Sequence, residues 1–324
     1  MRVLITGAAG QDGTILASQL HREDIAVWGL TKPGTAHARL ETYVPSVTIL
    51  EVDMEDADSV RQAVLDVQPT HIYNFGGFTA PGESWDHPEE VQRINFDAVD
   101  AMLAASRELI NPARFFQASS SHIFEGTDRS PQNEDFELSP HSPYAKSKAD
   151  ALNLVRKYRD EFGLFAVSGI LYNHESPLRT ENFVTRKVSK AVSEIVNGKR
   201  DILELGDIEV ARDWGWAPDY VRAMRLMMEA TSPSDYVLAT GISHRLSFFV
   251  EKAFSAAGIR DWRPYVKSAG SDRPNDTNKM VGDSTRAYRE LGWRHTVDFD
   301  SMAGEMVSFD LRLQDQPDAL WHGF

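Results

Sequence analysis

Residues 2–21 read RVLITGAAGQDGTILASQLH, and this stretch decides the fold class. The β-branched run at 2–6 predicts a strand, and helical periodicity runs from Thr14 to His21. Between them lie three glycines at three-residue spacing: Gly7, Gly10 and Gly13. A strand, a glycine loop and a helix in this order favour a dinucleotide-binding unit, because glycines let the backbone approach a pyrophosphate at the helix N-terminus. A glycine turn that only caps the helix is the alternative.

The alternation of strands and helices continues over about half of the chain. Strands are predicted at 26–30, 47–51, 71–75, 114–119 and 165–171, and helices at 57–67, 89–108 and 144–162. This order predicts an α/β fold built on a doubly wound parallel sheet. Ligands of such sheets bind at the carboxyl ends of the strands. Gly10, Gly76, Ser120 and Tyr144 all fall at or just after such ends.

The second half is less regular, and we expect it to form a smaller α/β domain that binds the substrate. Helices are predicted at 183–197, 218–229, 248–257 and 283–291, the last with Asp283 as its N-cap, and strands at 202–205 and 236–239. We expect residues 1–172 plus about 212–243 to form the dinucleotide-binding domain. Residues from about 173 to 211 plus 244–324 would form the second domain. The cleft between the two is the expected ligand site.

Composition excludes several classes of function. The chain has 324 residues and a formal net charge of −14, which disfavours nucleic acids and anionic membranes as partners. It contains no cysteine, so disulfides, thiolate metal sites and cysteine nucleophiles are excluded. No metal site is predicted. Neither a signal peptide nor a transmembrane run is recognisable, and we expect a cytoplasmic protein with no membrane contact.

The stretch SPYAKSK at 142–148 is the expected centre of the chemistry. Tyr144 and Lys148 are four residues apart, so they share one face of a helix. A free tyrosine has a pKa of about 10. A neighbouring ammonium is expected to lower that pKa and to make the phenol a general acid and base beside a nicotinamide. An exposed amphipathic pair is the alternative for this motif taken alone.

The end of the second predicted strand bears on the choice of cofactor. Proteins selective for NAD usually place an acidic residue there, to bind the ribose hydroxyls. Here Lys32 follows instead, and its charge would suit the 2′-phosphate of NADP. We therefore expect NADP, with NAD as the alternative; a solvated loop lysine is the competing explanation.

These motifs resemble those of the extended short-chain dehydrogenase/reductase superfamily, and more narrowly those of GDP-mannose 4,6-dehydratases. The matching segments span nearly the whole chain in order: GQDG at 10–13, GLFAV at 163–167, NHESP at 173–177, NFVTRK at 182–187, RDWG at 212–215, and 283–293. The resemblance implies a Rossmann-type sheet, a nicotinamide cofactor and a GDP-sugar substrate. It also implies a homodimer formed by the helices at 89–108 and 144–162.

The motifs and the resemblance together assign roles to individual residues. The catalytic residues would be Ser120, His122, Tyr144 and Lys148. The cofactor would be bound by Gly7, Gly10, Gln11, Asp12, Gly13, Lys32, Asp53 and Met54, together with Tyr144 and Lys148. The substrate would be bound by Asn173, Val184, Lys187, Arg212 and Arg273, with the two arginines on the diphosphate.

The chain departs from the family pattern around the expected sugar site. The family segment STSELYG is SSSHIFEG here, at 119–126, so Ser120 replaces a threonine and His122 replaces the glutamate. In a 4,6-dehydratase that glutamate removes the C5 proton. The polar set after the fourth strand is largely lost at Gly76-Gly77-Phe78, and Trp216 replaces a histidine. These changes are expected to lie in the pocket.

Several reactions fit this pattern. We favour a redox-neutral isomerisation of a GDP-hexose, of the epimerase or mutase type, because the dehydratase glutamate is missing. The alternative is a GDP-mannose 4,6-dehydratase in which His122 or Glu125 takes over the role of the glutamate. A GDP-4-keto-6-deoxyhexose reductase is the second alternative. A catalytically silent sensor is the fourth hypothesis, although it would not need Ser120, Tyr144 and Lys148.

Overall fold

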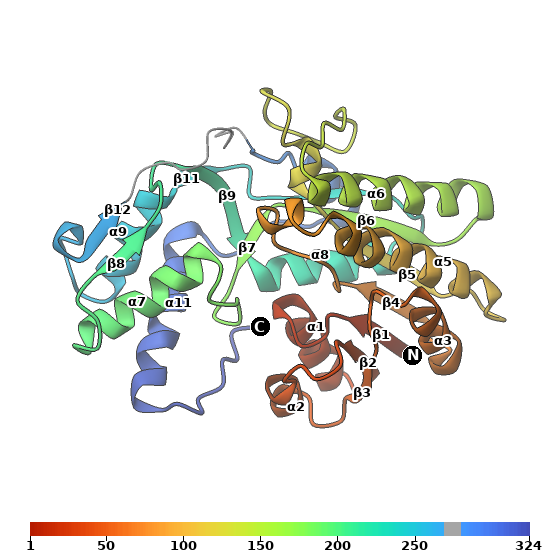
Figure 1. Cartoon of the computed structure of the whole chain (residues 1–324), viewed down its shortest axis with the longest axis horizontal. Helices are drawn as coiled ribbons and strands as arrows, with labels where there is room; N and C mark the ends of the chain where they lie inside the picture. The colour runs from red at the N-terminus through yellow and green to blue at the C-terminus, as the bar shows by residue number, and fades with distance from the viewer. Residues whose placement is uncertain (269–279) are drawn as a thin grey trace.

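The computed structural model describes residues 1–268 and 280–324, and it is built around a seven-stranded parallel sheet (Figure 1). The strands, in spatial order, are β10 (Tyr236–Leu238), β6 (Ala166–Leu171), β5 (Arg114–Ser120), β4 (His71–Asn74), β1 (Arg2–Thr6), β2 (Ala26–Thr31) and β3 (Thr48–Glu51). Every neighbouring pair in the sheet is parallel. The predicted doubly wound α/β sheet is confirmed.

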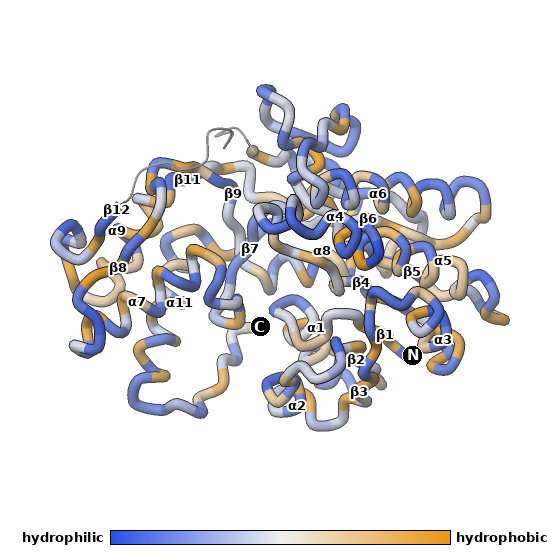
Figure 2. The backbone as a smooth tube through the Cα atoms, viewed as in Figure 1, coloured by the Kyte–Doolittle hydropathy of each residue, from blue (hydrophilic) through white to orange (hydrophobic). Residues whose placement is uncertain are grey.

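Helices cover both faces of this sheet, so its strands are apolar on both sides. The helices of this half are α1 (Gln11–Arg22), α2 (Ala38–Tyr43), α3 (Ala57–Val67), α4 (Pro88–Gln92), α5 (Ala98–Glu108), α6 (Pro143–Phe162) and α8 (Ala217–Glu229). α1 and α8 bury their apolar residues against one face, and α3 and α5 against the other. β6 is buried along its whole length. Figure 2 shows apolar residues on the strands and on the helices that cover them.

The helix predicted at 89–108 is interrupted. A π-helical turn, Arg93–Asp97, separates α4 from α5. It places the buried Asn95 so that its side-chain oxygen accepts the N–H of Phe78 at 2.9 Å and its amide donates to Ser147 Oγ at 3.0 Å. Such π-turns commonly mark functional sites. Here the turn joins the loop after β4 to the helix that carries Tyr144.

In its described residues, the second half contains two small sheets and four further α-helices. One sheet has the order β11 (Ser243–Arg245), β9 (Ala211–Trp216), β7 (Asn173–Glu175), and the other pairs β12 (Val266–Ser268) with β8 (Leu203–Leu205). The helices are α7 (Val184–Val196), α9 (Leu246–Ala256), α10 (Thr285–Leu291) and α11 (Phe299–Asp315). α11 was not expected from the sequence, and it packs on α7 and α9. None of the described helices combines the length and apolar character needed to cross a bilayer.

The predicted start of α10 is wrong by two residues. Ser284 stands at the N-cap position, and the helix begins at Thr285. Asp283 precedes the cap, and its carboxylate accepts the backbone N–H of Thr285 at 2.9 Å. The carboxylate therefore closes a turn just outside the helix, which a capping pattern read from sequence does not distinguish from a cap.

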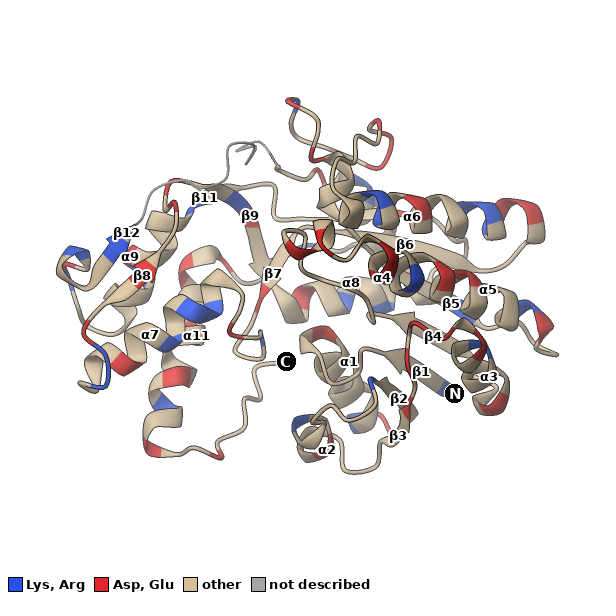
Figure 3. Cartoon of the chain, in the orientation of Figure 1, with Lys and Arg blue, Asp and Glu red and all other residues tan. Residues whose placement is uncertain are grey.

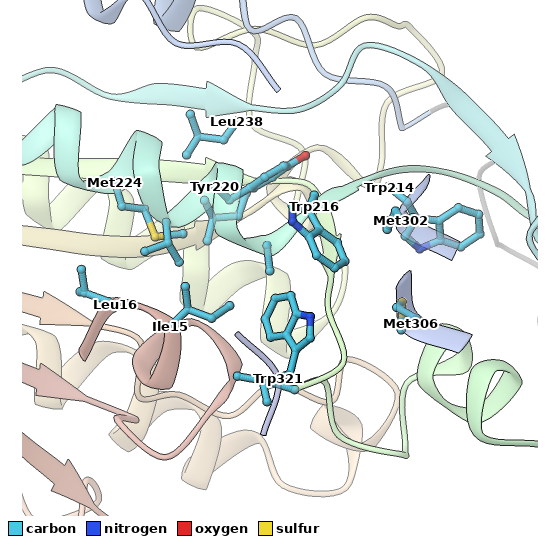
Figure 4. Close-up of a cluster of buried hydrophobic side chains, with 14 of the residues drawn as sticks. Ile15, Leu16, Trp214, Trp216, Tyr220, Met224, Leu238, Met302, Met306 and Trp321 are labelled. Atoms are coloured by element: carbon cyan, nitrogen blue, oxygen red, sulfur yellow. The ribbon is translucent and has the colours of Figure 1, made fainter. Parts of the chain in front are cut away.

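One continuous apolar core joins the two halves. Trp216, at the end of β9, packs edge to face on Trp321 with ring centroids 5.2 Å apart (Figure 4). The backbone N–H of Trp321 donates to the Tyr43 hydroxyl at 2.6 Å, which ties the last residues to α2. The expectation that Trp216 lies in the sugar pocket is therefore wrong: its side chain is core. The two-domain boundaries stay a prediction, although α8 and β10 do lie on the central sheet.

Candidate active site

The glycine loop forms a cradle that side chains would fill. Gly7 adopts a φ of +62°, in the left-handed region that favours glycine. A Cβ on Gly13 would lie 2.5 Å from the carbonyl oxygen of Gly7, which is too close for any other residue. The N–H of Gly10 donates to that same carbonyl at 2.9 Å. The loop thus brings bare backbone to the first turn of α1, the geometry that a dinucleotide pyrophosphate requires.

The side chains of Gln11 and Asp12 face the second half of the chain. Gln11 donates to the carbonyl of His174 at 3.1 Å and accepts from the hydroxyl of Ser176 at 2.8 Å. Asp12 Oδ2 lies 2.9 Å from His174 Nε2. Burial opposes both charges, but the ion pair lowers the pKa of Asp12 and raises the pKa of His174. Because these side chains are already engaged, Gln11 and Asp12 would contact the cofactor through their backbone N–H groups.

The other predicted cofactor residues follow the ends of β2 and β3. Lys32 is exposed directly after β2. Asp53, after β3, is exposed and accepts the N–H of Glu55 at 3.0 Å. Met54 packs partly against the core on that face of the sheet. Lys32 follows β2, which is adjacent to β1, and Asp53 and Met54 follow β3, the next strand along. All three therefore lie at the same edge of the sheet as the glycine loop.

Two arginines at this edge are missing from the sequence prediction. Arg39 donates to the carbonyls of Ala9 and Leu178 at 2.7 and 3.0 Å, which puts a positive charge against the glycine loop. Arg179 stacks on Phe183, with its guanidinium carbon 3.5 Å from the ring centroid. Its position two residues after the NHESP segment is the signal that could have identified it. Both cations suit an anionic cofactor.

Tyr144 and Lys148 do share one face of α6, and both are buried. The helix starts at an N-cap, Ser142, whose hydroxyl accepts the N–H of Ala145 at 3.2 Å. Lys148 Nζ donates to the carbonyl of Ala118 at 3.1 Å. Burial lowers the pKa of Lys148 to about 8. The hydroxyl of Ser120 hydrogen-bonds Tyr144. Tyr144 and Lys148 of α6 thus contact Ser120 and Ala118 at the end of β5.

The expected effect of Lys148 on Tyr144 is not what the structure shows. Burial raises the pKa of Tyr144, and the opposing influences are the hydrogen bond from Ser120 and the charge of Arg179. Lys148 Nζ lies 5.9 Å from the centroid of the tyrosine ring and is committed to a carbonyl. Helical spacing places the two side chains on one face, but it does not by itself bring the ammonium to the phenol oxygen.

The two glycines after β4 leave room for this pair. A Cβ on Gly77 would lie 2.9 Å from Asn95 Oδ1 and 3.3 Å from Lys148 Nζ. The N–H of Gly76 donates to Thr6 Oγ1 at 2.8 Å, which fixes the loop to the end of β1. Gly77 therefore permits the close approach of Lys148, and Asn95 is a supporting residue that the sequence reasoning missed.

His122 lies on the short 3₁₀ turn Ser121–Phe124 that follows β5. Its ring meets Tyr144 edge to face, with centroids 5.6 Å apart. His122 Nδ1 lies 3.0 Å from Glu125 Oε2. The other oxygen of Glu125 accepts the backbone N–H groups of His141 at 2.9 Å and Ser142 at 2.5 Å. Burial would raise the pKa of Glu125, but these hydrogen bonds hold it at about 2.

The predicted substrate residues lie around the small sheet that continues from β6. Leu171 pairs with Ser120 across the central sheet, and Asn173 opens β7 two residues later. Arg212 lies on the adjacent strand β9. Val184 is the first residue of α7, and Lys187, one turn on, donates to the carbonyl of Glu204 at 2.7 Å. Arg273 lies outside the described residues.

A glycine cradle at the first turn of α1, a buried serine at the end of β5 and Tyr-x-x-x-Lys on α6 together define a short-chain dehydrogenase/reductase of the extended type. A family model described as GDP-mannose 4,6 dehydratase matches residues 4–306. The chain belongs to this family, and the prediction that it is an enzyme of this class is confirmed.

Known proteins support this assignment at two levels. The chain is 37% identical over 338 residues to a GDP-mannose 4,6-dehydratase of Sinorhizobium fredii, with 95% of this chain and 96% of that protein covered. A GDP-mannose 4,6 dehydratase of Drosophila melanogaster is 34% identical over 339 residues, covering 96% and 86%. The fold matches UDP-glucose 4-epimerase of Thermus thermophilus in complex with NAD, with a TM-score of 0.83, 24% identity, and 96% and 99% coverage.

Proposed function

We propose that this chain is a GDP-mannose 4,6-dehydratase in which a histidine held by a carboxylate replaces the usual glutamate. The observation that carries the proposal is the placement of His122, which stands edge to face on Tyr144 and hydrogen-bonds Glu125. An imidazole can accept and return a proton near neutral pH. Dehydration therefore does not require a glutamate at this position. The family membership favours dehydration over the isomerisation that the sequence alone suggested.

The chain's own residues account for the proton steps. Tyr144, hydrogen-bonded to Ser120, would take the proton from the hydroxyl on C4 of the sugar as that carbon is oxidised. His122 would then remove the C5 proton and protonate the C6 hydroxyl as it leaves as water. A nicotinamide held at the glycine cradle would supply the reversible hydride acceptor that this reaction needs. His122 would then deliver a solvent-derived proton to C5, and Tyr144 would release the proton taken from the C4 hydroxyl to solvent. The net change is the loss of one water.

The cofactor that best fits the site is NADP, with NAD as the alternative. The glycine cradle and the first turn of α1 suit a pyrophosphate. Lys32 is exposed at the end of β2, where an NAD-selective protein usually carries an acid. Equilibrium binding of NADPH and NADH to the wild-type chain and to K32E tests this choice, since K32E should weaken NADPH binding selectively.

A second candidate is a redox-neutral isomerisation of a GDP-hexose. The observation that favours it is the histidine itself, which could return the C5 proton to the opposite face instead of protonating the leaving hydroxyl. A reductase acting on a GDP-4-keto-6-deoxyhexose would have no use for this group. The assay is the mass of the product formed from GDP-mannose and, for the reductase, from a GDP-4-keto-6-deoxyhexose. From GDP-mannose, loss of one water supports dehydration and unchanged mass supports isomerisation. A gain of two hydrogens by the 4-keto sugar in the presence of NADPH supports reduction.

We further propose a homodimer formed through α5 and α6. Both helices lie on the same side of the sheet, and the exposed side of α6 carries charges of both signs (Figure 3). Lys146 and Asp150 are both exposed on α6, which suits reciprocal ion pairs between two copies. Sedimentation equilibrium tests this proposal, because a single monomeric species would contradict it. The cytoplasmic location stays a prediction.

A further inference from the structure

The strongest unassigned feature is the carboxylate of Glu125, whose two oxygens are both engaged. Oε2 meets His122 Nδ1 at 3.0 Å, and Oε1 accepts the N–H groups of His141 and Ser142. A carboxylate with this set of partners holds its charge and is a poor proton carrier. The sequence left open whether His122 or Glu125 takes over from the missing glutamate. The hydrogen bonds favour His122.

The same contacts decide which nitrogen of His122 is available. With its pKa held at about 2, Glu125 is ionised near neutral pH and can only accept hydrogen bonds. The proton in the 3.0 Å contact must therefore belong to His122 Nδ1. In the neutral ring this leaves Nε2 as the basic nitrogen. The His122 side chain keeps 31% of its surface exposed, so the ring remains accessible.

Glu125 also fixes the imidazole relative to the helix of Tyr144. Ser142, whose N–H binds Glu125 Oε1, is the N-cap of α6, and Tyr144 follows two residues later. At the other end, the N–H of His122 donates to Ser120 Oγ at 3.3 Å. One carboxylate thus connects the turn after β5 to the first turn of α6, and it sets the position of the two proton-transfer groups together.

We infer that Glu125 is a positioning residue: it locks His122 in the Nδ1–H tautomer, so that Nε2, and not Nδ1, exchanges protons with C5 and the C6 oxygen of the sugar. This inference rests on the proposed function. Nε2 takes the proton from C5, leaving the ring doubly protonated against the Glu125 carboxylate. The same proton then passes from Nε2 to the C6 oxygen, which departs as water, and the ring returns to its neutral form. No other reactant is consumed in these two transfers.

The test compares E125Q with two matched controls. E137Q changes an exposed glutamate in the same loop. E90Q changes a glutamate whose Oε2 lies 3.6 Å from His87 Nδ1, in a histidine–glutamate pair with the same i,i+3 spacing as His122 and Glu125. Nitrogen-15 NMR of histidine-labelled protein, with His122 identified through H122N, reports the tautomer without substrate. We expect an Nδ1–H signature for His122 in the wild type, E137Q and E90Q, and its loss in E125Q. An Nε2–H tautomer in the wild type would overturn the inference.

Kinetics separate positioning from folding. With GDP-mannose in D2O, E125Q should slow deuterium entry at C5 by about 10- to 100-fold, the rate equivalent of one charge-assisted hydrogen bond. The transient absorbance of reduced nicotinamide, which reports oxidation at C4, should stay as in E137Q. Equal loss of both signals would make Glu125 merely structural and contradict the inference. If the wild type converts no GDP-hexose, the proposed function fails, while the NMR result still decides the tautomer.

Discussion

Asp12 and His174 form a largely buried ion pair, with Oδ2 and Nε2 2.9 Å apart, that joins the first turn of α1 to β7. His174 also stacks on Tyr220 of α8 with ring centroids 4.7 Å apart. The pair lies between the glycine loop and the NHESP segment, so it couples the expected cofactor site to the expected substrate site. The glycine loop and the NHESP segment lie far apart in sequence, and this ion pair holds them together in the structure.

Breaking this pair from one side should be costly. D12N leaves a buried imidazolium or forces it to lose its proton, and removal of one partner of a buried pair typically costs about 3–5 kcal/mol. We expect a loss of unfolding free energy of that order, measured by urea denaturation. D12N combined with H174F should recover part of the loss, since the phenyl ring can keep the stack on Tyr220. Equal stability of D12N and the wild type would contradict the coupling.

Replacing Tyr144 with phenylalanine should abolish turnover and leave the fold intact. The phenol is the proposed proton acceptor, and general acid–base groups contribute about 10²- to 10⁴-fold to rate. Y144F should therefore lower kcat by at least that range, with little change in the affinity for GDP by calorimetry. Retention of wild-type turnover would remove Tyr144 from the mechanism.

A methyl group at residue 77 should disturb the site through Lys148. The added Cβ in G77A would lie 3.3 Å from Lys148 Nζ and 2.9 Å from Asn95 Oδ1, so one of them must move. A displacement on the order of 1 Å can cost about 10²-fold in rate. G82A is the matched control, because a Cβ there meets nothing within 4 Å. Comparable activity in the two variants would show that the approach of Gly77 to Lys148 is unimportant.

The buried lysine predicts a basic limb in the rate profile of the free enzyme. Burial lowers the pKa of Lys148 to about 8, so the ammonium loses its proton as the pH rises through that value. If the charge assists Tyr144 or binds the cofactor ribose, kcat/KM should fall above pH about 8. K148R should move this limb to higher pH, because a guanidinium stays charged. A profile flat through this region would separate the charge of Lys148 from catalysis.

Glu125 predicts a pH-dependent contribution to stability. Its pKa is about 2 in the folded protein against 4.5 for a free glutamate. The unfolded chain therefore binds more protons between these values, and the contribution is complete above pH 4.5 and lost as the pH falls toward 2. The difference in unfolding free energy between wild type and E125Q should shrink over that interval. A constant difference would mean that the carboxylate charge is not stabilising.

Local patterns predicted the sheet well and the second half less well. The strand–loop–helix at 2–21 repeats a local rule, so β1, the glycine cradle and α1 follow from the sequence. α11 was missed, although its buried residues Phe299, Met302 and Met306 keep helical spacing. The helical spacing of these apolar residues could have predicted α11. The π-turn at Arg93–Asp97 depends on the long-range contacts of Asn95, and no pattern in the local sequence indicates it.

The sequence predicted which residues meet at the site, but not the hydrogen bonds that they make there. Motif spacing placed Ser120, His122, Tyr144 and Lys148 together, and the structure brings them together. It could not predict that Lys148 is committed to a carbonyl, because that hydrogen bond joins residues 30 positions apart. It also could not decide between His122 and Glu125, since the choice rests on backbone N–H groups from a loop 16 and 17 residues further on.

The most direct test follows a deuterium atom placed at C4 of GDP-mannose. If the chain catalyses 4,6-dehydration, the product lacks one water and carries the label at C6, because the hydride removed from C4 returns there. H122N should stop at the oxidised C4 stage, with reduced nicotinamide on the enzyme and no water lost. A product of unchanged mass that keeps its label at C4 would contradict dehydration and establish isomerisation.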